Sequence, residues 1–243
     1  MISVLIPAYN EADRIAATLA AVRSFAEERH ISEIIVVDDG STDDTAARAQ
    51  EAGADVVFRQ TNSGKGAALN RALSLAQGDI LLLLDADLGA TATEAVQLLS
   101  PVVSGAADMT IATFPRNTGK GGGVGLVVRL ARWGIARLTG QKMQAPLSGQ
   151  RAVRRQVLED SGGFADGWGA EVALTVSALQ NGYRVLEIGT QMSHRVTGRS
   201  PAAILHRAQQ FVAAWRALLR LGVLRPKSTS TPEMPPPKEW PQG

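Results

Sequence analysis

The chain has 243 residues, a formal net charge of +2 and 45% hydrophobic residues, which is enough to bury the core of an ordinary α/β domain. It contains no cysteine, which excludes disulfides, thiolate catalysis and cysteine-zinc sites and fits a reducing cytosol. No apolar stretch reaches the ~18 residues of a membrane span. The N-terminus enters an apolar run at once, without a basic leader, so we expect no signal peptide and a cytoplasmic location.

Charge is distributed unevenly along the chain. Residues 1–112 carry 7 Lys and Arg against 16 Asp and Glu, whereas residues 113–243 carry 18 against 7. An acidic half that holds a cation, facing a basic half that binds phosphate, suits a metal-diphosphate ligand; two solvated faces of opposite sign are the alternative. No basic run is interleaved with aromatic residues and no nucleic-acid motif occurs, so we expect no nucleic-acid partner.

In the first half of the chain, apolar runs alternate with segments of helical periodicity. Continuously apolar strands are typical of a parallel sheet whose two faces are covered by helices, so we predict an α/β fold. The predicted strands are 2–8, 33–38, 55–58 and 79–85, and the predicted helices are 11–29, 43–53 and 65–77.

The second half is less regular. Its predicted elements are helices over 124–139, 169–181 and 201–222 and a strand over 184–190. A glycine-rich loop at 119–123 is either flexible or faces a phosphate, and six prolines among nineteen residues predict a disordered tail over 225–243. We expect a single domain over 1–222, with a nucleotide-binding half (1–113) and an acceptor-binding half (114–222).

Two carboxylates follow the most apolar predicted strand. Asp85 and Asp87 come directly after the run Ile80–Leu84, and side chains two apart on a strand point to the same face. Ligands of open α/β sheets bind beyond the carboxyl ends of the strands. Asp85 and Asp87 can therefore converge on a Mg²⁺ or Mn²⁺ ion, or on a cation and a ribose.

Polar residues also follow the first two predicted strands. Asn10 and Glu11 can reach a base or a ribose from the start of a helix, or Asn10 can simply cap that helix. After the second strand, four aspartates fall within seven residues. We expect Asp43 and Asp44 to cap the next helix, and Asp38 and Asp39 to be the ligand candidates.

A third polar segment, Asn62–Ala68, precedes the helix predicted at 65–77. It lacks the spacing of a Walker A loop. Gly64 permits close approach of a ligand to the backbone, and Lys65 supplies a cation.

Together these segments resemble the family 2 glycosyltransferases and their GT-A relatives. The matching runs are Ile-Pro-Ala-Tyr-Asn-Glu, Val-Val-Asp-Asp-Gly-Ser-Thr-Asp, Gly-Lys-Gly-Ala-Ala-Leu-Asn and Asp-Ala-Asp, in that order. The resemblance implies a Rossmann-like GT-A fold and a nucleoside diphosphate sugar as donor, with a divalent ion, Mg²⁺ or Mn²⁺, between Asp87 and the diphosphate. The donor residues it implies are Pro7, Ala8, Asn10, Glu11, Asp38, Asp39, Gly64, Lys65, Asp85, Ala86 and Asp87.

Two segments of the second half carry further similarities. Ser148-Gly149-Gln150-Arg151 resembles the Ser/Thr-Gly-x-Arg segment of polyprenyl-phosphate sugar transferases, but lacks the aspartate that usually precedes it. Gly167–Leu174 is similar to the Gly-x-Glu-x-x-Leu segment of glucosyl-3-phosphoglycerate synthases, which makes Glu171 the candidate catalytic residue.

The same resemblances imply acceptor and metal contacts farther along the chain. His194 falls where GT-A enzymes often have a third metal ligand. Ser148, Gly149 and Arg151 are implied to bind an acceptor or its phosphate. Arg195 and Arg199 could bind an anionic acceptor, and a solvated loop is the alternative.

The predicted activity is transfer of a sugar from the donor, with uracil favoured by the resemblance, to a hydroxyl or a phosphate. Glu171 would be the general base for an alcohol, whereas it would orient a phosphate acceptor, which is already deprotonated. The stereochemical outcome stays open between retention and inversion.

Several alternatives stay open. The basic helices could hold a polyprenyl-phosphate transferase peripherally at the inner membrane face, although we favour a small soluble phosphorylated acceptor. A non-catalytic module that binds nucleotide sugars and a nucleotidyltransferase are rival functions. Both a monomer and a homodimer are compatible with the sequence.

Overall fold

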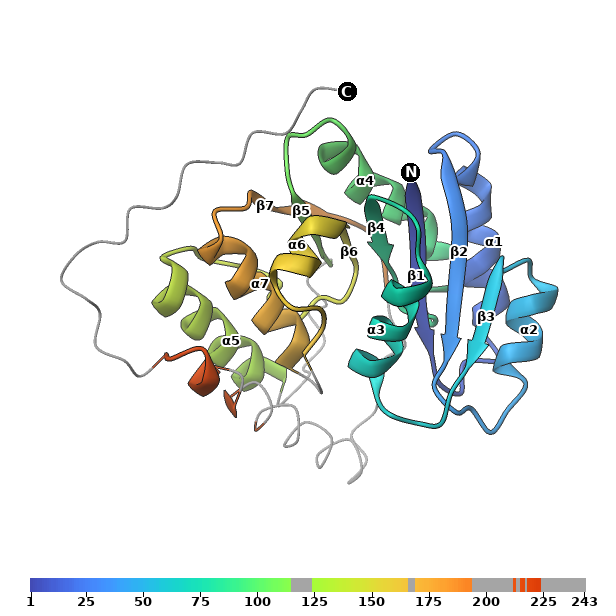
Figure 1. The fold of residues 1–243 in the computed structure, drawn as a ribbon, viewed down its shortest axis with the longest axis horizontal. Helices are drawn as coiled ribbons and strands as arrows, with labels where there is room; N and C mark the ends of the chain where they lie inside the picture. The colour runs from blue at the N-terminus through green and yellow to red at the C-terminus, as the bar shows by residue number, and fades with distance from the viewer. Residues whose placement is uncertain (115–123, 166–168, 194–211, 213–214, 217, 224–243) are drawn as a thin grey trace.

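The computed structural model describes residues 1–114, 124–165, 169–193, 212, 215–216 and 218–223 (Figure 1). These residues form a seven-stranded sheet in the order β3-β2-β1-β4-β6-β5-β7. The strands are β1 (Ile2–Ala8), β2 (Ile31–Asp38), β3 (Val56–Arg59), β4 (Ile80–Leu83), β5 (Met109–Thr113), β6 (Arg151–Arg154) and β7 (Val185–Gly189).

The sheet is mostly parallel. β1 pairs in parallel with β2 and β4, β2 with β3, and β5 with β7, whereas β6 runs antiparallel between β4 and β5. The carboxyl ends of β1, β2, β4 and β5 therefore lie along one edge, the lower edge of the sheet in Figure 1. This arrangement confirms the predicted α/β fold.

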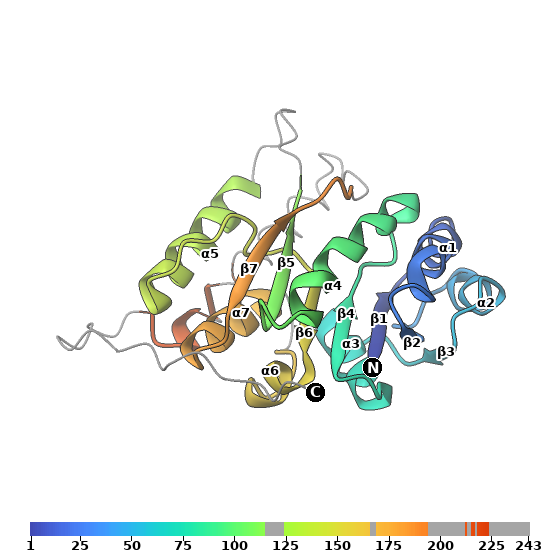
Figure 2. The same cartoon turned by 90° about the horizontal axis from the view of Figure 1, so that it is seen from above.

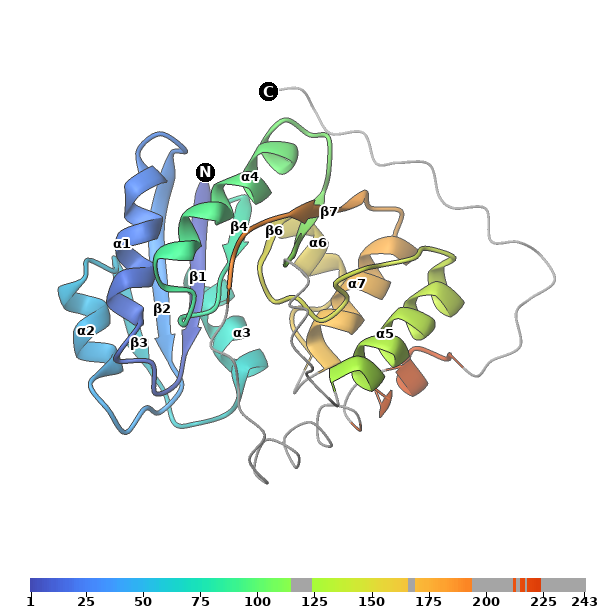
Figure 3. The ribbon, with the colours of Figure 1, turned by 180° about the vertical axis from the view of Figure 1, so that it is seen from behind.

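Helices cover both faces of the sheet. They are α1 (Ile15–Ala26), α2 (Thr45–Glu51), α3 (Lys65–Leu75), the 3₁₀ helix η1 (Gly89–Ala95), α4 (Val96–Val103), α5 (Val124–Thr139), α6 (Arg155–Asp160) and α7 (Ala170–Gln180). One core cluster packs α1, α2, η1 and α4 on the sheet, and a second packs α3, α5, α6 and α7 on the opposite face. Figures 2 and 3 show α1 and α4 together on the first face.

The structure differs from the predicted elements in several places, and it contains η1, α4, β5, β6 and α6, which were not predicted. α1 begins at Ile15 rather than residue 11, because backbone groups of residues 10–12 are bonded to the loop after β2. β4 ends at Leu83, which leaves Asp85 in a loop. The short antiparallel strand β6 was not predicted, because four residues flanked by arginines give no clear period-2 signal.

Some predictions fall on residues outside the described part of the chain. These are the glycine-rich loop at 119–123, most of the helix predicted at 201–222, and the tail at 225–243. The two core clusters both combine residues from before and after residue 113, so the two predicted halves share one sheet and its cores. Among the described residues, no helix combines the length and the hydropathy needed to cross a membrane.

Candidate active site

A hollow of about 290 Å³ opens at the carboxyl ends of β1, β2 and β4. It brings together most of the residues predicted to bind a donor, although they come from three separate loops and from the start of α3. The lining residues are Pro7, Ala8, Tyr9, Glu11, Asp39, Lys65, Ala68, Asp85, Ala86 and Asp87. Tyr9 and Ala68 were not predicted, and Asn10, Asp38 and Gly64 lie outside the lining.

The loop after β1 is bound tightly to the loop after β2. The backbone N–H groups of Asn10, Glu11 and Ala12 donate to Ser41 Oγ, Thr45 Oγ1 and Asp43 Oδ2 at 2.9, 2.8 and 3.2 Å. Asn10 has a φ of 54°, which asparagine tolerates, and its Oδ1 accepts from the Thr42 N–H at 2.8 Å. These backbone N–H groups are therefore already bonded within the protein. Asn10 does not cap α1 and does not line the hollow.

Asp38 and Asp39 have different surroundings. Asp38 is fully buried: its Oδ1 accepts from the Ser41 N–H at 2.9 Å, and its Oδ2 lies 3.3 Å from Arg59 Nε. This position differs from the predicted donor contact, because the carboxylate lies under its own loop. Asp39 lines the hollow, and it accepts from Gln60 Nε2 and from the N–H groups of Ser63 and Gly64 at 2.7 to 2.9 Å.

Lys65 links two carboxylates on the floor of the site. Its Nζ lies 2.6 Å from Asp85 Oδ1 and 3.6 Å from Glu171 Oε1. Burial acts to lower the pKa of Lys65, but the charges of Asp85 and Glu171 outweigh it and raise that pKa above its usual value. Lys65 is therefore a permanent cation at neutral pH, placed between the predicted donor residues and the predicted catalytic residue.

Gly149 packs directly against this ammonium group. A Cβ at Gly149 would lie 2.6 Å from Lys65 Nζ and 3.4 Å from Asp85 Oδ1. Real Cβ atoms do not approach other atoms so closely, and only glycine leaves this space for Lys65. The predicted acceptor segment thus touches the donor site at this residue.

The carbonyls of the Asp-Ala-Asp loop are held by α1. Thr18 Oγ1 donates to the Ala86 carbonyl at 2.8 Å, and Arg14 Nη1 donates to the Asp87 carbonyl at 3.2 Å. These bonds fix the backbone that carries Asp87 beside the hollow. One carboxylate together with the phosphates of a substrate is a usual set of ligands for Mg²⁺, so the residues fit the predicted ion.

Protein ligands alone do not form a metal centre here. Within the described ranges, no group of three His, Asp or Glu residues could hold a metal ion. His194, the third predicted ligand, lies outside those ranges, as do Arg195 and Arg199.

Arg151 has a structural position rather than the predicted place at an acceptor. It is only 1% exposed, and its guanidinium donates to the carbonyl of Ser148 at 2.8 Å and to Thr175 Oγ1 at 2.9 Å. Burial lowers the pKa of Arg151 to about 10, and the charges of Glu171 and Glu187 oppose that shift. Ser148 is also buried, so Arg151 shapes the loop before β6 and joins it to α7.

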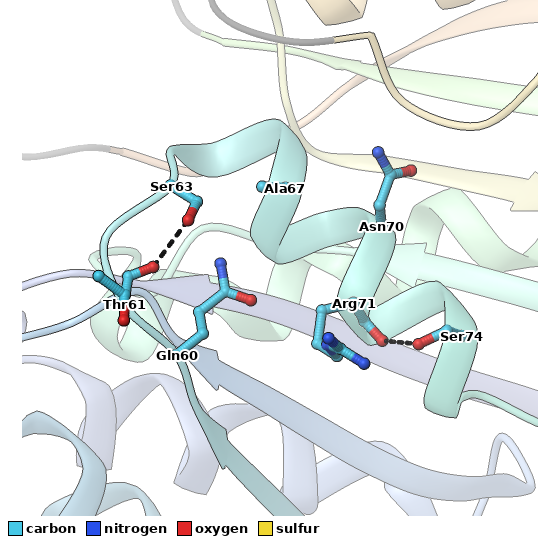
Figure 4. Close-up of a pocket in the computed structure, with 7 residues that line it drawn as sticks. All are labelled: Gln60, Thr61, Ser63, Ala67, Asn70, Arg71 and Ser74. Atoms are coloured by element: carbon cyan, nitrogen blue, oxygen red, sulfur yellow. Dashed lines mark hydrogen bonds between the residues drawn. The ribbon is translucent and has the colours of Figure 1, made fainter.

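Two further hollows lie near the site. One of about 450 Å³ lies at the end of β5, on the same sheet edge, with Arg132 and Lys142 beside Phe114 and Met143. The other, of about 510 Å³, runs along α3 (Figure 4). It contains no predicted site residue, and its only charged lining residue, Arg71, stacks over the Phe58 ring at 4.8 Å.

Three residues at the site were not predicted from the sequence: Ala68, Tyr9 and Gln150. Tyr9 lies inside the first motif and is half exposed at the hollow; its aromatic ring beside Asn10 was the available signal. Gln150 lies inside the Ser-Gly-Gln-Arg segment, and no spacing rule relates it to Asp85, 65 residues earlier. Its Nε2 nevertheless donates to Asp85 Oδ2 at 2.6 Å.

The mostly parallel sheet and the carboxylates at the ends of β1, β2 and β4 agree with the fold and the site that the motifs predicted. The model of the glycosyl transferase family 2 matches residues 3–162, and the chain belongs to that family. The motifs of the first half predicted this membership.

Several curated proteins are similar to the chain. It is 32% identical to glycosyltransferase AglJ of Haloferax volcanii over 81% of this chain and 64% of that protein. It is 36% identical to glucosyl-3-phosphoglycerate synthase of Mycolicibacterium paratuberculosis over 73% of this chain and 60% of that protein. The chain thus spans less than two thirds of these two relatives. Identity to polyprenol monophosphomannose synthase of Mycolicibacterium smegmatis is 32%, over 91% of both chains.

Solved structures confirm the GT-A fold. Glucosyl-3-phosphoglycerate synthase from Mycobacterium tuberculosis, in complex with Mn²⁺, UDP and phosphoglyceric acid, matches with a TM-score of 0.76 and 28% identity. The match covers 94% of this chain and 80% of that one. The same enzyme with Mn²⁺, UDP-glucose and phosphoglyceric acid matches with a TM-score of 0.73 and 27% identity, over 94% and 81%.

Proposed function

We propose that the protein transfers a sugar from a uridine diphosphate sugar to a phosphorylated acceptor, with Mg²⁺ or Mn²⁺ held at Asp87. The observation that carries the proposal is the single hollow in which Asp39, Asp87 and the Lys65–Asp85 pair meet at the carboxyl edge of the sheet. The solved relatives that bind Mn²⁺ with UDP or UDP-glucose support the donor class.

The residues of the hollow have distinct roles in this proposal. Tyr9 offers an exposed aromatic ring against which a base can stack. The Lys65 ammonium stabilises the negative charge that grows on the departing diphosphate. A divalent ion, when bound, supplies Lewis-acid stabilisation of the same charge.

A phosphate acceptor fits the reacting end of the site. Its second ionisation, near ~6, leaves it largely deprotonated at neutral pH, so a phosphate oxygen can form the bond to the sugar without a general base while UDP leaves. Glu171, 3.6 Å from Lys65, then orients the acceptor and holds Lys65. The hollow beside β5 supports an anionic acceptor, because Arg132 and Lys142 supply two cations along the same edge.

UDP release from UDP-glucose, measured with phosphoglycerate or with unphosphorylated glycerate as acceptor, tests the proposal. We expect turnover with the phosphorylated acceptor only. Replacing Lys142 with alanine should raise KM for phosphoglycerate several-fold and leave the donor KM unchanged. The Gln141→Ala variant, at an exposed neighbouring position, is the matched control. Equal turnover with glycerate would contradict the phosphate assignment.

A polyprenyl phosphate is the second candidate acceptor. The full-length similarity to a polyprenol monophosphomannose synthase favours it. So does the surface of α5, where Leu126 is 63% exposed and Trp133 46% exposed, with exposed Arg129 nearby. Flotation with anionic liposomes separates the candidates. Binding at low salt, with transfer to polyprenyl phosphate but not to phosphoglycerate, would favour the lipid; no binding would exclude it.

A further inference from the structure

Gln150 makes a buried contact with the first aspartate of the Asp-Ala-Asp loop. Its side chain is fully buried, and its Nε2 donates to Asp85 Oδ2 at 2.6 Å. The other oxygen of the same carboxylate, Oδ1, lies 2.6 Å from Lys65 Nζ. Asp85 is thus held from both sides, by an amide and by an ammonium group.

The backbone of Gln150 is itself fixed. Its carbonyl accepts from the Ala112 N–H at 2.9 Å, at the end of β5. The next residue, Arg151, begins β6 and pairs with Leu83 at the end of β4. Gln150 therefore stands on a rigid part of the sheet, between the two strands that border it, and its side chain reaches across to the loop after β4.

We propose that Gln150 is a positioning residue for sugar transfer, which acts through Asp85 on Lys65. Its amide orients the Asp85 carboxylate so that Oδ1 faces Lys65, and Asp85 in turn holds the ammonium group between the donor hollow and Glu171. This inference rests on the proposed function only in assigning Lys65 to the donor diphosphate. It also gives the two aspartates different roles, in which Asp85 orients Lys65 and Asp87 binds the metal ion.

Loss of the amide would disturb this arrangement in a definite order. Without Gln150 Nε2, the Asp85 carboxylate loses a buried donor and can turn about its side-chain bonds. Lys65 would then shift toward Glu171, its second carboxylate. The ammonium group would thereby leave the position from which it faces the donor.

A double-mutant cycle between Gln150 and Asp85 tests the proposal. Methionine at position 150 keeps a similar volume but cannot donate, and asparagine at position 85 has only one acceptor oxygen for its two partners. We expect Gln150→Met to lower kcat/KM for the donor about tenfold in the native background and less than about twofold in the Asp85→Asn background. An equal loss in both backgrounds, or no loss in the native one, would overturn the proposal.

Thermal unfolding of the same four proteins, without ligand, provides a second readout. Because both single variants remove the same contact, the melting temperature of the double variant should fall by less than the sum of the decreases in the two single variants. Additive changes would overturn the Gln150–Asp85 contact whatever the donor is. Failure of the native protein to bind any uridine diphosphate sugar would instead overturn the proposed function.

Gln97 offers a matched control. Its Nε2 donates to Glu94 Oε2 at 2.7 Å, which is the same amide-to-carboxylate bond, but it is exposed on α4 and outside the site. The Gln97→Met variant should retain kcat/KM for the donor within about twofold.

Discussion

On the proposed donor side of the site, the side chains that face the hollow come from loops directly after β1, β2 and β4 and from the start of α3. On the proposed acceptor side, Gly149 and Gln150 precede the antiparallel strand β6, and Glu171 lies in the first turn of α7. The donor side is thus built from one repeated feature, the carboxyl end of a parallel strand. The acceptor side depends on how separate elements pack together.

This difference has a consequence for function. A donor site assembled at strand ends binds the constant part of the substrate, the nucleoside diphosphate, with residues whose positions the sheet dictates. The acceptor side can vary through its loops without disturbing that sheet. Lys65, between Asp85 and Glu171, is the point at which the two sides meet.

The largest effect is expected on the donor side, at Asp87. Replacing it with alanine removes the carboxylate proposed to hold the metal ion, and should weaken Mn²⁺-dependent binding of UDP-glucose by roughly 100-fold, about 2.7 kcal/mol. Isothermal titration calorimetry measures this directly. Asp13→Ala, at an exposed aspartate, is the control. Unchanged affinity for UDP-glucose in the Asp87 variant would mean that Asp87 does not hold the metal ion.

On the acceptor side, Glu171→Gln should lower kcat about tenfold and leave donor affinity unchanged, because the residue orients the acceptor. Steady-state kinetics and a donor titration separate these quantities, with exposed Glu159→Gln on α6 as the control. A loss of roughly 10² to 10⁴ would instead indicate a general base and an alcohol acceptor.

The junction of the two sides can be disturbed at Gly149. An added methyl group would meet Lys65 Nζ, the flexible end of a side chain, so the fold should survive while Lys65 moves. We expect Gly149→Ala to lower kcat/KM several-fold with little change in melting temperature. Gly125→Ala on α5, where an added Cβ meets nothing within 4 Å, should leave kcat/KM unaltered. Equal kcat/KM in both variants would mean that the position of Lys65 does not affect the reaction.

The smallest effect concerns stability, where Asp43 joins the loops after β1 and β2. Slight burial acts to raise its pKa, but hydrogen bonds from Thr45 and Ala12 outweigh this and hold the pKa below 3.8. Asp43 therefore contributes stability that is present above that pH and is lost as the pH falls through the lower folded-state pKa.

Chemical denaturation between pH 2.5 and 7 checks this expectation, at roughly the range in which aspartates titrate. The Asp43→Asn variant should be less stable than the native protein at neutral pH, and the difference should shrink as the solution becomes acidic. The Asp44→Asn variant is the matched control, because the Asp44 side chain makes no cap bond. A difference independent of pH would contradict the role of the Asp43 charge.

Local sequence patterns predicted most of the residues that meet in the hollow, because apolar strands and the polar residues that end them are adjacent in the chain. The same patterns could not distinguish Asp38 from Asp39, since burial of one carboxylate under the loop depends on Arg59 and Ser41. The acceptor side was predicted less well. Arg151 was predicted to bind an acceptor or its phosphate, whereas the structure buries it against α7. The contact of Gln150 with Asp85 is purely tertiary, and no local rule contains it.

We propose that the hollow at the ends of β1, β2 and β4 binds a uridine diphosphate sugar with a divalent ion. Calorimetric titration of UDP-glucose and GDP-mannose into the native protein, each with and without Mn²⁺, measures this binding. We predict binding of UDP-glucose that requires Mn²⁺, and at least about tenfold weaker binding of GDP-mannose. Tighter binding of GDP-mannose, or binding of UDP-glucose that is unaffected by removal of Mn²⁺, would contradict the claim.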